Sequence, residues 1–77
     1  MNDLLNNINR IHTTELGMIR IRKNLSIDSD GVEYCKKKIL DKNCKITKQG
    51  KNWYCTIDNI VITVNSYNYC IITAHKK

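Results

Sequence analysis

The spacing of the apolar residues changes once along this chain, near Cys44, and that change limits the fold more than any other feature. Before Cys44 the apolar residues recur every three or four positions, and after it they alternate with polar residues. The first spacing is typical of amphipathic helices and the second of half-buried strands. The sequence therefore predicts an α+β domain in which helices come first and strands follow.

Three helices are predicted within residues 1–43. Thr14 is suited to cap the second helix, and Asp30 with Glu33 resembles a capping box for the third. The third helix is expected to stop near Asn43. The faces of the helices are formed by Leu4, Leu5, Ile8 and Ile11 in the first, by Leu16, Ile19 and Lys23 in the second, with Met18, Ile21 and Leu25 alongside, and by Val32, Cys35 and Ile39 in the third.

Four strands are predicted within residues 44–77, separated by turns at residues 49–52, 58–59 and 66–68. Asp58 and Asn59 suit a two-residue hairpin loop because both tolerate positive φ. Short turns join antiparallel neighbours, so the strands should form a meander with the helices packed on one face. We expect one domain over residues 1–77, with a helical part at 1–43 and a sheet at 44–77.

The positive charge is concentrated in one stretch. The chain has 77 residues and a net charge of +6. Residues 36–51 carry seven Lys and one Asp, whereas residues 1–35 carry four basic and five acidic groups. Screening limits attraction to about 8–10 Å at physiological salt, so lysines attract phosphate together only if they converge on one surface. The alternative is a solvated surface whose lysines complement a helix dipole.

A binding site for phosphate-bearing ligands is the first interpretation of this stretch. Lysines would attract the anion, and nearby aromatic rings would stack on bases. Trp53 is instead expected in the core, because it shares a strand face with Cys55 and Ile57. The candidate ligand-binding residues are Lys36, Lys37, Lys45, Lys48, Lys51, Tyr54, Tyr67, Tyr69 and Lys76.

His12 and His75 are the candidates for catalysis. In a metal-independent ribonuclease a histidine can transfer the proton while a lysine stabilises charge on the phosphate. The alternative is that His12 is a capping or packing residue and His75 a solvated one. The sequence has no nucleophile motif and no glycine-rich phosphate loop, so a binding protein is favoured over an enzyme.

The four cysteines are interpreted as reduced thiols. No pair has the CxxC spacing and neither histidine has zinc-finger spacing, so neither a metal site nor a cofactor is predicted. No apolar run approaches the roughly 20 residues of a membrane span. The first ten residues lack the pattern of a signal peptide. We therefore expect a cytoplasmic protein of a bacterium or an infected cell, without membrane contact.

Five segments resemble a family of short bacterial and phage proteins of unknown function. They are HTTELG (12–17), RIRKNL (20–25), GKNWYCTIDN (50–59), ITVNSYNY (62–69) and IITAHK (71–76). The resemblance covers nearly the whole chain and implies no activity. It is compatible with a phage or mobile-element accessory role.

Three functions are compared. The first is a small basic protein that captures nucleic acid or a nucleotide signal, in a phage or prophage counter-defence setting. The second is the ribonuclease toxin that uses His12 or His75. The third is an inhibitor that binds an acidic or nucleic-acid-binding host protein. The last strand has high β propensity and its edge could pair with a second copy, so a homo-oligomer through a sheet edge is also predicted.

Overall fold

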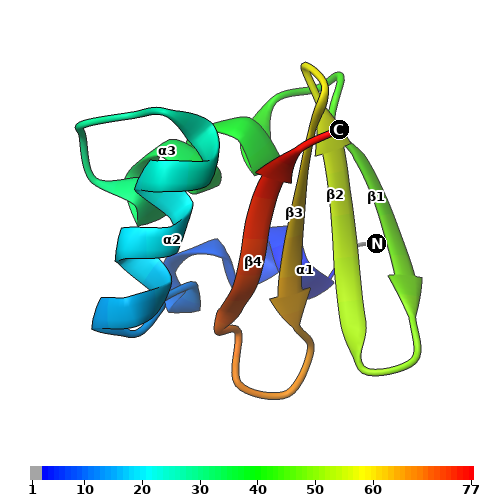
Figure 1. Cartoon of the computed structure of the whole chain (residues 1–77). Helices are drawn as coiled ribbons and strands as arrows, with labels where there is room; N and C mark the ends of the chain where they lie inside the picture. The colour runs from blue at the N-terminus through cyan, green and yellow to red at the C-terminus, as the bar shows by residue number, and fades with distance from the viewer. Residues whose placement is uncertain (1–2) are drawn as a thin grey trace.

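The computed structural model of this chain, described over residues 3–77, confirms helices followed by a four-stranded antiparallel sheet (Figure 1). The predicted class, α+β, is correct. The elements in chain order are α1 (Asp3–Asn6), η1 (Ile8–Arg10), α2 (Glu15–Leu25), α3 (Gly31–Leu40), β1 (Lys45–Gln49), β2 (Asn52–Ile57), β3 (Ile60–Asn65) and β4 (Ile71–Lys76).

The first predicted helix consists of two short helical segments. α1 ends at Asn6, and Asn7 has φ −120° and ψ 27°, which is outside the helical region. Asparagine side chains compete for backbone hydrogen bonds and lower helix propensity, and three of them lie at positions 6, 7 and 9. The apolar face still forms, because Leu4 and Ile11 are both buried.

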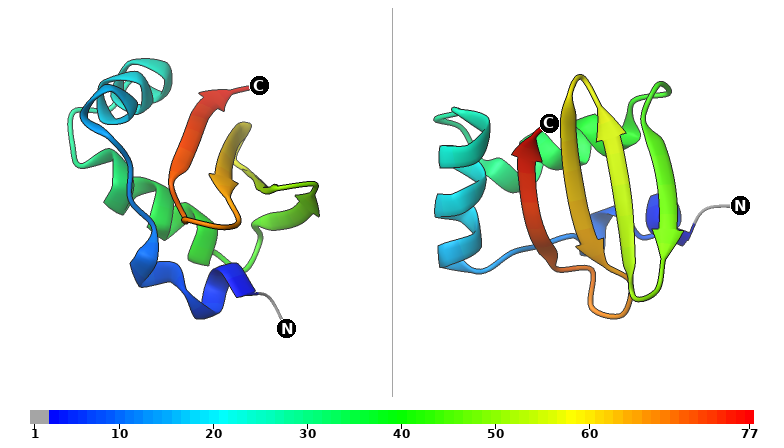
Figure 2. Two further views of the ribbon diagram at one scale, coloured as in Figure 1. Left: turned by 90° about the horizontal axis from the view of Figure 1, so that it is seen from below. Right: turned by 45° about the vertical axis from the view of Figure 1, so that its right-hand side comes forward.

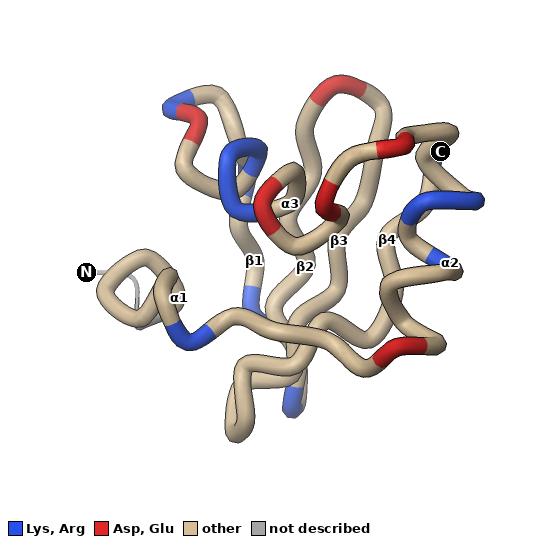
Figure 3. Tube along the Cα trace, turned by 90° about the vertical axis from the view of Figure 1, so that its left-hand side faces the viewer, with Lys and Arg blue, Asp and Glu red and all other residues tan. Residues whose placement is uncertain are grey.

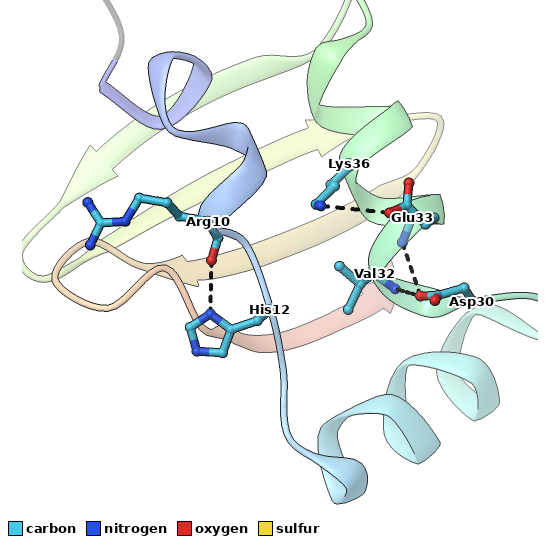
Figure 4. Close-up of polar contacts among 6 residues, drawn as sticks. All are labelled: Arg10, His12, Asp30, Val32, Glu33 and Lys36. Carbon is cyan, nitrogen blue, oxygen red and sulfur yellow. Dashed lines mark hydrogen bonds and ion pairs between the residues drawn. The ribbon is translucent and has the colours of Figure 1, made fainter.

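Both longer helices begin at the caps that the sequence predicts. Thr14 Oγ1 accepts a hydrogen bond from the N–H of Gly17 at 3.0 Å. Asp30 Oδ1 accepts from the N–H groups of Val32 and Glu33 at 2.9 and 3.2 Å (Figure 4). These bonds satisfy amide groups that have no partner inside a helix. The caps therefore fix where α2 and α3 start.

Gly31 permits the close approach of α2 and α3. A Cβ atom at this position would lie 2.8 Å from Cγ2 of Ile21 and 2.9 Å from Sδ of Met18, both on α2. The N–H of Gly31 also donates to the Met18 sulfur at 3.1 Å. The start of α3 can therefore pack against α2 only because this residue has no side chain.

The sheet is a meander with strand order β1-β2-β3-β4. The predicted hairpin loop is confirmed: Asp58 and Asn59 have φ values of 52° and 64°, and Ile57 pairs with Ile60. Gly50, with φ 59°, lies in the turn between β1 and β2. These two tight turns fix the register of β1, β2 and β3, and hence the face on which each side chain lies.

The outer edge of β4 is occupied by the N-terminal half of the chain. The N–H of Ile71 donates to the carbonyl of His12 at 2.8 Å, and the N–H of His12 donates to the carbonyl of Tyr69 at 3.2 Å. Further along the strand, Nδ2 of Asn24 donates to the carbonyl of Ala74 at 3.2 Å. An oligomer through the edge of β4 would have to displace these bonds, whereas β1 lies at the other edge of the sheet.

The helices are arranged in two ways around the sheet. α1, η1 and α3 cover one face, and α2 lies beside β4 (Figure 2). The core between them combines helical residues with one face of the strands. Its buried members are Leu4, Ile11, Ile21, Leu25, Cys35 and Ile39 from the helical part, and Trp53, Cys55, Ile57, Ile60, Ile62, Val64, Tyr69, Ile71 and Ala74 from the sheet part.

None of the helices formed by the described residues is long and apolar enough to cross a membrane.

Candidate functional site

The lysines of α3 do not form a free phosphate-binding surface. Lys36 Nζ lies 3.7 Å from the carboxylate of Glu33 (Figure 4), and Lys38 Nζ donates to Oδ2 of Asp58 at 2.6 Å. The hydrogen bond to Asp58 raises the pKa of Lys38. Lys37 is exposed and lies on the side of α3 opposite its buried residues. Two of these three lysines therefore already have carboxylate partners.

The lysines of β1 lie on opposite faces of the sheet. Lys45 pairs with Thr56, whereas Lys48 pairs with Trp53 on the helical side, where its Nζ lies 5.9 Å from the Trp53 ring. Lys51 follows in the turn after Gly50 and is exposed. The seven lysines of residues 36–51 are thus distributed over both layers. The single electropositive surface that the first interpretation requires does not form.

The candidate tyrosines also separate. Tyr69 is in the core, with 7% of its surface exposed, and its ring packs against Trp53 at 5.5 Å between centroids. Cζ of Arg10 lies 4.4 Å from the same ring. Tyr69 thus has protein partners where a base would stack. Tyr67, which is 73% exposed, lies in the turn before β4, and only Tyr54 lies on the sheet face that faces away from the helices.

That sheet face, called the open face below, carries no helix among residues 3–77 (Figure 2). Strand pairing aligns its side chains in three rows across the sheet. The first row joins Lys45, Thr56, Val61 and His75. The second joins Thr47, Tyr54, Thr63 and Thr73, and the third joins Gln49, Asn52 and Asn65.

Tyr54 lies in the middle row of the open face. It pairs with Thr47 on β1 and with Thr63 on β3. Its hydroxyl accepts a hydrogen bond from Nδ2 of Asn52 at 3.5 Å. The ring is half-buried among these short side chains. An aromatic ring held among threonines can offer an apolar surface to a planar ligand, with hydroxyl groups beside it for hydrogen bonds.

The open face has a lysine but no carboxylates. Neither Asp nor Glu occurs in any of the four described strands. The only acidic residue after Asp41 is Asp58, and its carboxylate is bonded to Lys38. Lys45 and His75 are exposed at the two ends of the first row. Lys76, at the end of β4, is exposed as well, but it pairs with Ile60 and so lies on the other face of the sheet. An anion that approaches this face therefore meets no opposing charge on it.

The two candidate catalytic histidines lie far apart. The backbone of His12 pairs with Cys70, and His75 is five residues further along. At roughly 3.3 Å per strand residue the separation is about 16 Å. Nδ1 of His12 donates to the carbonyl of Arg10 at 2.9 Å (Figure 4). General acid and base must both reach the reacting groups, so this backbone separation argues against a site that uses both histidines on one phosphate.

All four cysteines are free thiols. Burial raises the pKa of the Cys35 and Cys55 thiols to about 12, and it also raises the pKa of the half-buried Cys44 thiol. A thiol with a raised pKa is a poor nucleophile and a poor metal ligand at neutral pH. No group of three or more metal-ligating side chains gathers within the described part of the chain.

The threonines of the open face, Thr47, Thr56 and Thr63, were not among the residues that the sequence singled out. Alternation places them opposite the apolar face, and the tight turns give the register that aligns them with Tyr54. Counting back from Asp58 and Asn59 would pair Tyr54 with Thr63. The alignment of these threonines with Tyr54 could therefore have been predicted from the turn lengths, but not from the residue types alone.

Comparison with known proteins gives one match. The model of the family described as "Protein of unknown function (DUF3781)" matches residues 5–75. No curated protein and no solved structure matches the chain.

Proposed function

We propose that this protein, which belongs to the DUF3781 family, binds single-stranded nucleic acid through the open face of its sheet. The family description gives no activity, so the proposal is based on the face itself. The observation that carries it is a sheet surface with an aromatic ring, six exposed or half-buried hydroxyl or amide side chains and Lys45 at one end of a row, but without a carboxylate.

Each part of the open face has a role in this proposal. Tyr54 stacks on a base, because every base has a π-face and stacking needs no particular sequence. Lys45 contacts a phosphate, and Lys51 in the adjacent turn extends the positive potential. Threonine, asparagine and glutamine side chains donate to or accept from base edges and the sugar–phosphate backbone. The proposal is one of binding, and a ribonuclease that uses His12 or His75 stays the alternative.

The affinity should be modest and sensitive to salt. A face with Lys45, with Lys51 in the adjacent turn and with one ring compares with non-specific binders, whose dissociation constants are on the order of 10⁻⁵ M at physiological salt. A phage or prophage counter-defence role remains a prediction about the setting, and it follows from no contact in the fold.

Fluorescence anisotropy with a labelled single-stranded oligonucleotide tests the proposal. Tyr54→Ala should weaken binding about tenfold, since a stacked base contributes roughly 1–3 kcal/mol. Lys45→Gln should weaken binding and reduce the slope of log K against log salt by about 0.7. Lys37→Gln is the matched control, because it removes the same charge from the exposed side of α3 and should change nothing.

Two results would overturn the proposal. One is binding that Tyr54→Ala leaves unchanged. The other is an equal loss in Lys37→Gln and Lys45→Gln, which would indicate attraction by net charge alone. The ribonuclease alternative is checked in the same samples: cleavage of an RNA oligonucleotide that His12→Ala or His75→Ala abolishes would replace binding with catalysis.

A further inference from the structure

α2 has apolar side chains on two opposite sides. Ile21 and Leu25 are buried against the rest of the protein. Leu16 and Ile19 are 66% and 62% exposed, which makes them the two most exposed aliphatic side chains among residues 4–77. A surface helix normally has one apolar stripe, facing the core. The second pair therefore lies outside the buried core of this chain.

The exposed pair lies beside three basic residues of the later turns of α2, with Glu15 at the start of the helix, four residues before Ile19. Leu16, Ile19 and Lys23 are spaced three and four residues apart, so they share one side of α2. Arg20 and Arg22 flank this side. We call these five residues the outer α2 face. In Figure 3, which faces this side of the molecule, α2 is blue over its later turns and red only at its start, where the sequence places Glu15.

The three basic side chains of this face differ in whether they already have a partner within the chain. Nε of Arg22 donates to the carbonyl of Ser29 at 3.0 Å. Arg20 and Lys23 are exposed, and neither forms an ion pair with a described residue. They are thus free to pair with carboxylates from outside the chain, Lys23 on the same side of α2 as Leu16 and Ile19 and Arg20 beside it.

We propose that the outer α2 face docks an acidic amphipathic helix of a partner protein. The apolar stripe of that helix would cover Leu16 and Ile19, and its carboxylates would pair with Arg20 and Lys23. A second copy of this chain fits less well, because a two-fold contact would bring like charges together. This surface lies on α2, beside β4, and not on the open face, so the inference is independent of the proposed function.

A synthetic helical peptide built from glutamate and leucine, with the leucines on one side, is the probe. Titration into the ¹⁵N-labelled protein should shift amide signals of α2 and leave those of β1 and β2 in place. The double variant Leu16→Ala/Ile19→Ala should bind the peptide at least tenfold more weakly. Leu40→Ala is the control, since Leu40 is an exposed aliphatic residue at the end of α3.

Charge is tested separately from apolar contact. Arg20→Gln/Lys23→Gln should also weaken binding, and a peptide with lysine in place of glutamate should not bind. Far-UV circular dichroism shows whether each variant is folded, and Ile19→Glu provides a second way to block the face if the alanine variant is not. Oligonucleotide binding should be unchanged in all of these α2 variants. A negative result with the peptide therefore does not affect the proposal that the open face binds nucleic acid.

Several outcomes would overturn the inference. The peptide could fail to bind, or bind wild type and Leu16→Ala/Ile19→Ala equally. Vesicles of phosphatidylserine and phosphatidylcholine could bind the protein through Leu16 and Ile19 while the peptide does not, which would assign the face to an anionic membrane. Sedimentation could show a dimer that the double variant abolishes, which would assign it to a second copy.

Discussion

At the scale of single residues, the positive φ values of the β2–β3 loop have a measurable cost. Asn59 has φ 64°, a conformation that glycine adopts without a steric penalty. Asn59→Gly should therefore raise the free energy of unfolding by about 0.5 kcal/mol, and Asn59→Ala should lower it by about 1 kcal/mol. Urea unfolding of the three proteins measures both changes. A destabilised glycine variant would contradict the assigned turn.

The buried thiols make stability depend on pH in the alkaline range. Burial raises the pKa of Cys35 and Cys55 from 9.0 to about 12. Between these values the unfolded chain loses thiol protons that the folded protein keeps. The contribution to stability is therefore complete below about pH 9 and decreases as the pH rises, by about 1.4 kcal/mol per pH unit for each thiol.

Urea unfolding under reducing conditions at pH 8, 9 and 10 tests this dependence. Wild type should lose stability more steeply with pH than Cys35→Ala/Cys55→Ala, which lacks both thiols. The difference in slope between the two proteins is the quantity of interest, because lysine and tyrosine groups titrate in both. Equal slopes would mean that these thiols are accessible to water in the folded state.

At the scale of elements, the position of α2 beside β4 depends in part on one side chain. Asn24 donates to the carbonyl of Ala74 across this contact. Asn24→Ala should lower the free energy of unfolding by about 1 kcal/mol and speed amide exchange in β4. Asn43→Ala, at an exposed residue after α3, should change stability by less than about 0.5 kcal/mol. An equal change in the free energy of unfolding for Asn24→Ala and Asn43→Ala would show that the hydrogen bond from Asn24 to Ala74 does not stabilise the fold.

The elements themselves could largely be predicted from local signals. The caps at Thr14 and Asp30 and the loop at Asp58 and Asn59 act over three or four residues, and all three are present in the structure. The break at Asn7 was missed, because the apolar spacing of residues 4–11 continues through it. The contact of His12 with β4 was missed as well, since it joins residues 58 positions apart.

At the scale of the whole molecule, charge clustered in sequence is not clustered in space. Residues 36–51 include the end of a helix on one layer and a strand whose side chains alternate between faces. The sequence therefore located the charge correctly but could not show that Lys38 pairs with Asp58, which lies 20 positions away. Tyr54 and Lys45, which belong to the proposed site, were already candidates from the sequence, whereas the burial of Tyr69 against Trp53 depends on tertiary packing.

The arrangement of helices and sheet in the whole molecule also determines which face of the sheet is open to the proposed ligand. Helices cover one face of the sheet, and in the proposed function the anion contacts the other face, whose strands contain neither Asp nor Glu. Net charge alone would attract nucleic acid to many parts of the surface. The proposed function requires that contact be restricted to the open face.

Chemical-shift mapping measures that restriction directly. A short single-stranded oligonucleotide is titrated into the ¹⁵N-labelled protein at physiological salt. We expect the largest shifts at Lys45, Thr47, Tyr54, Thr63 and Thr73, and none along the exposed side of α3 around Lys37. Shifts that follow the lysines of α3 and leave the open face unchanged would contradict the account.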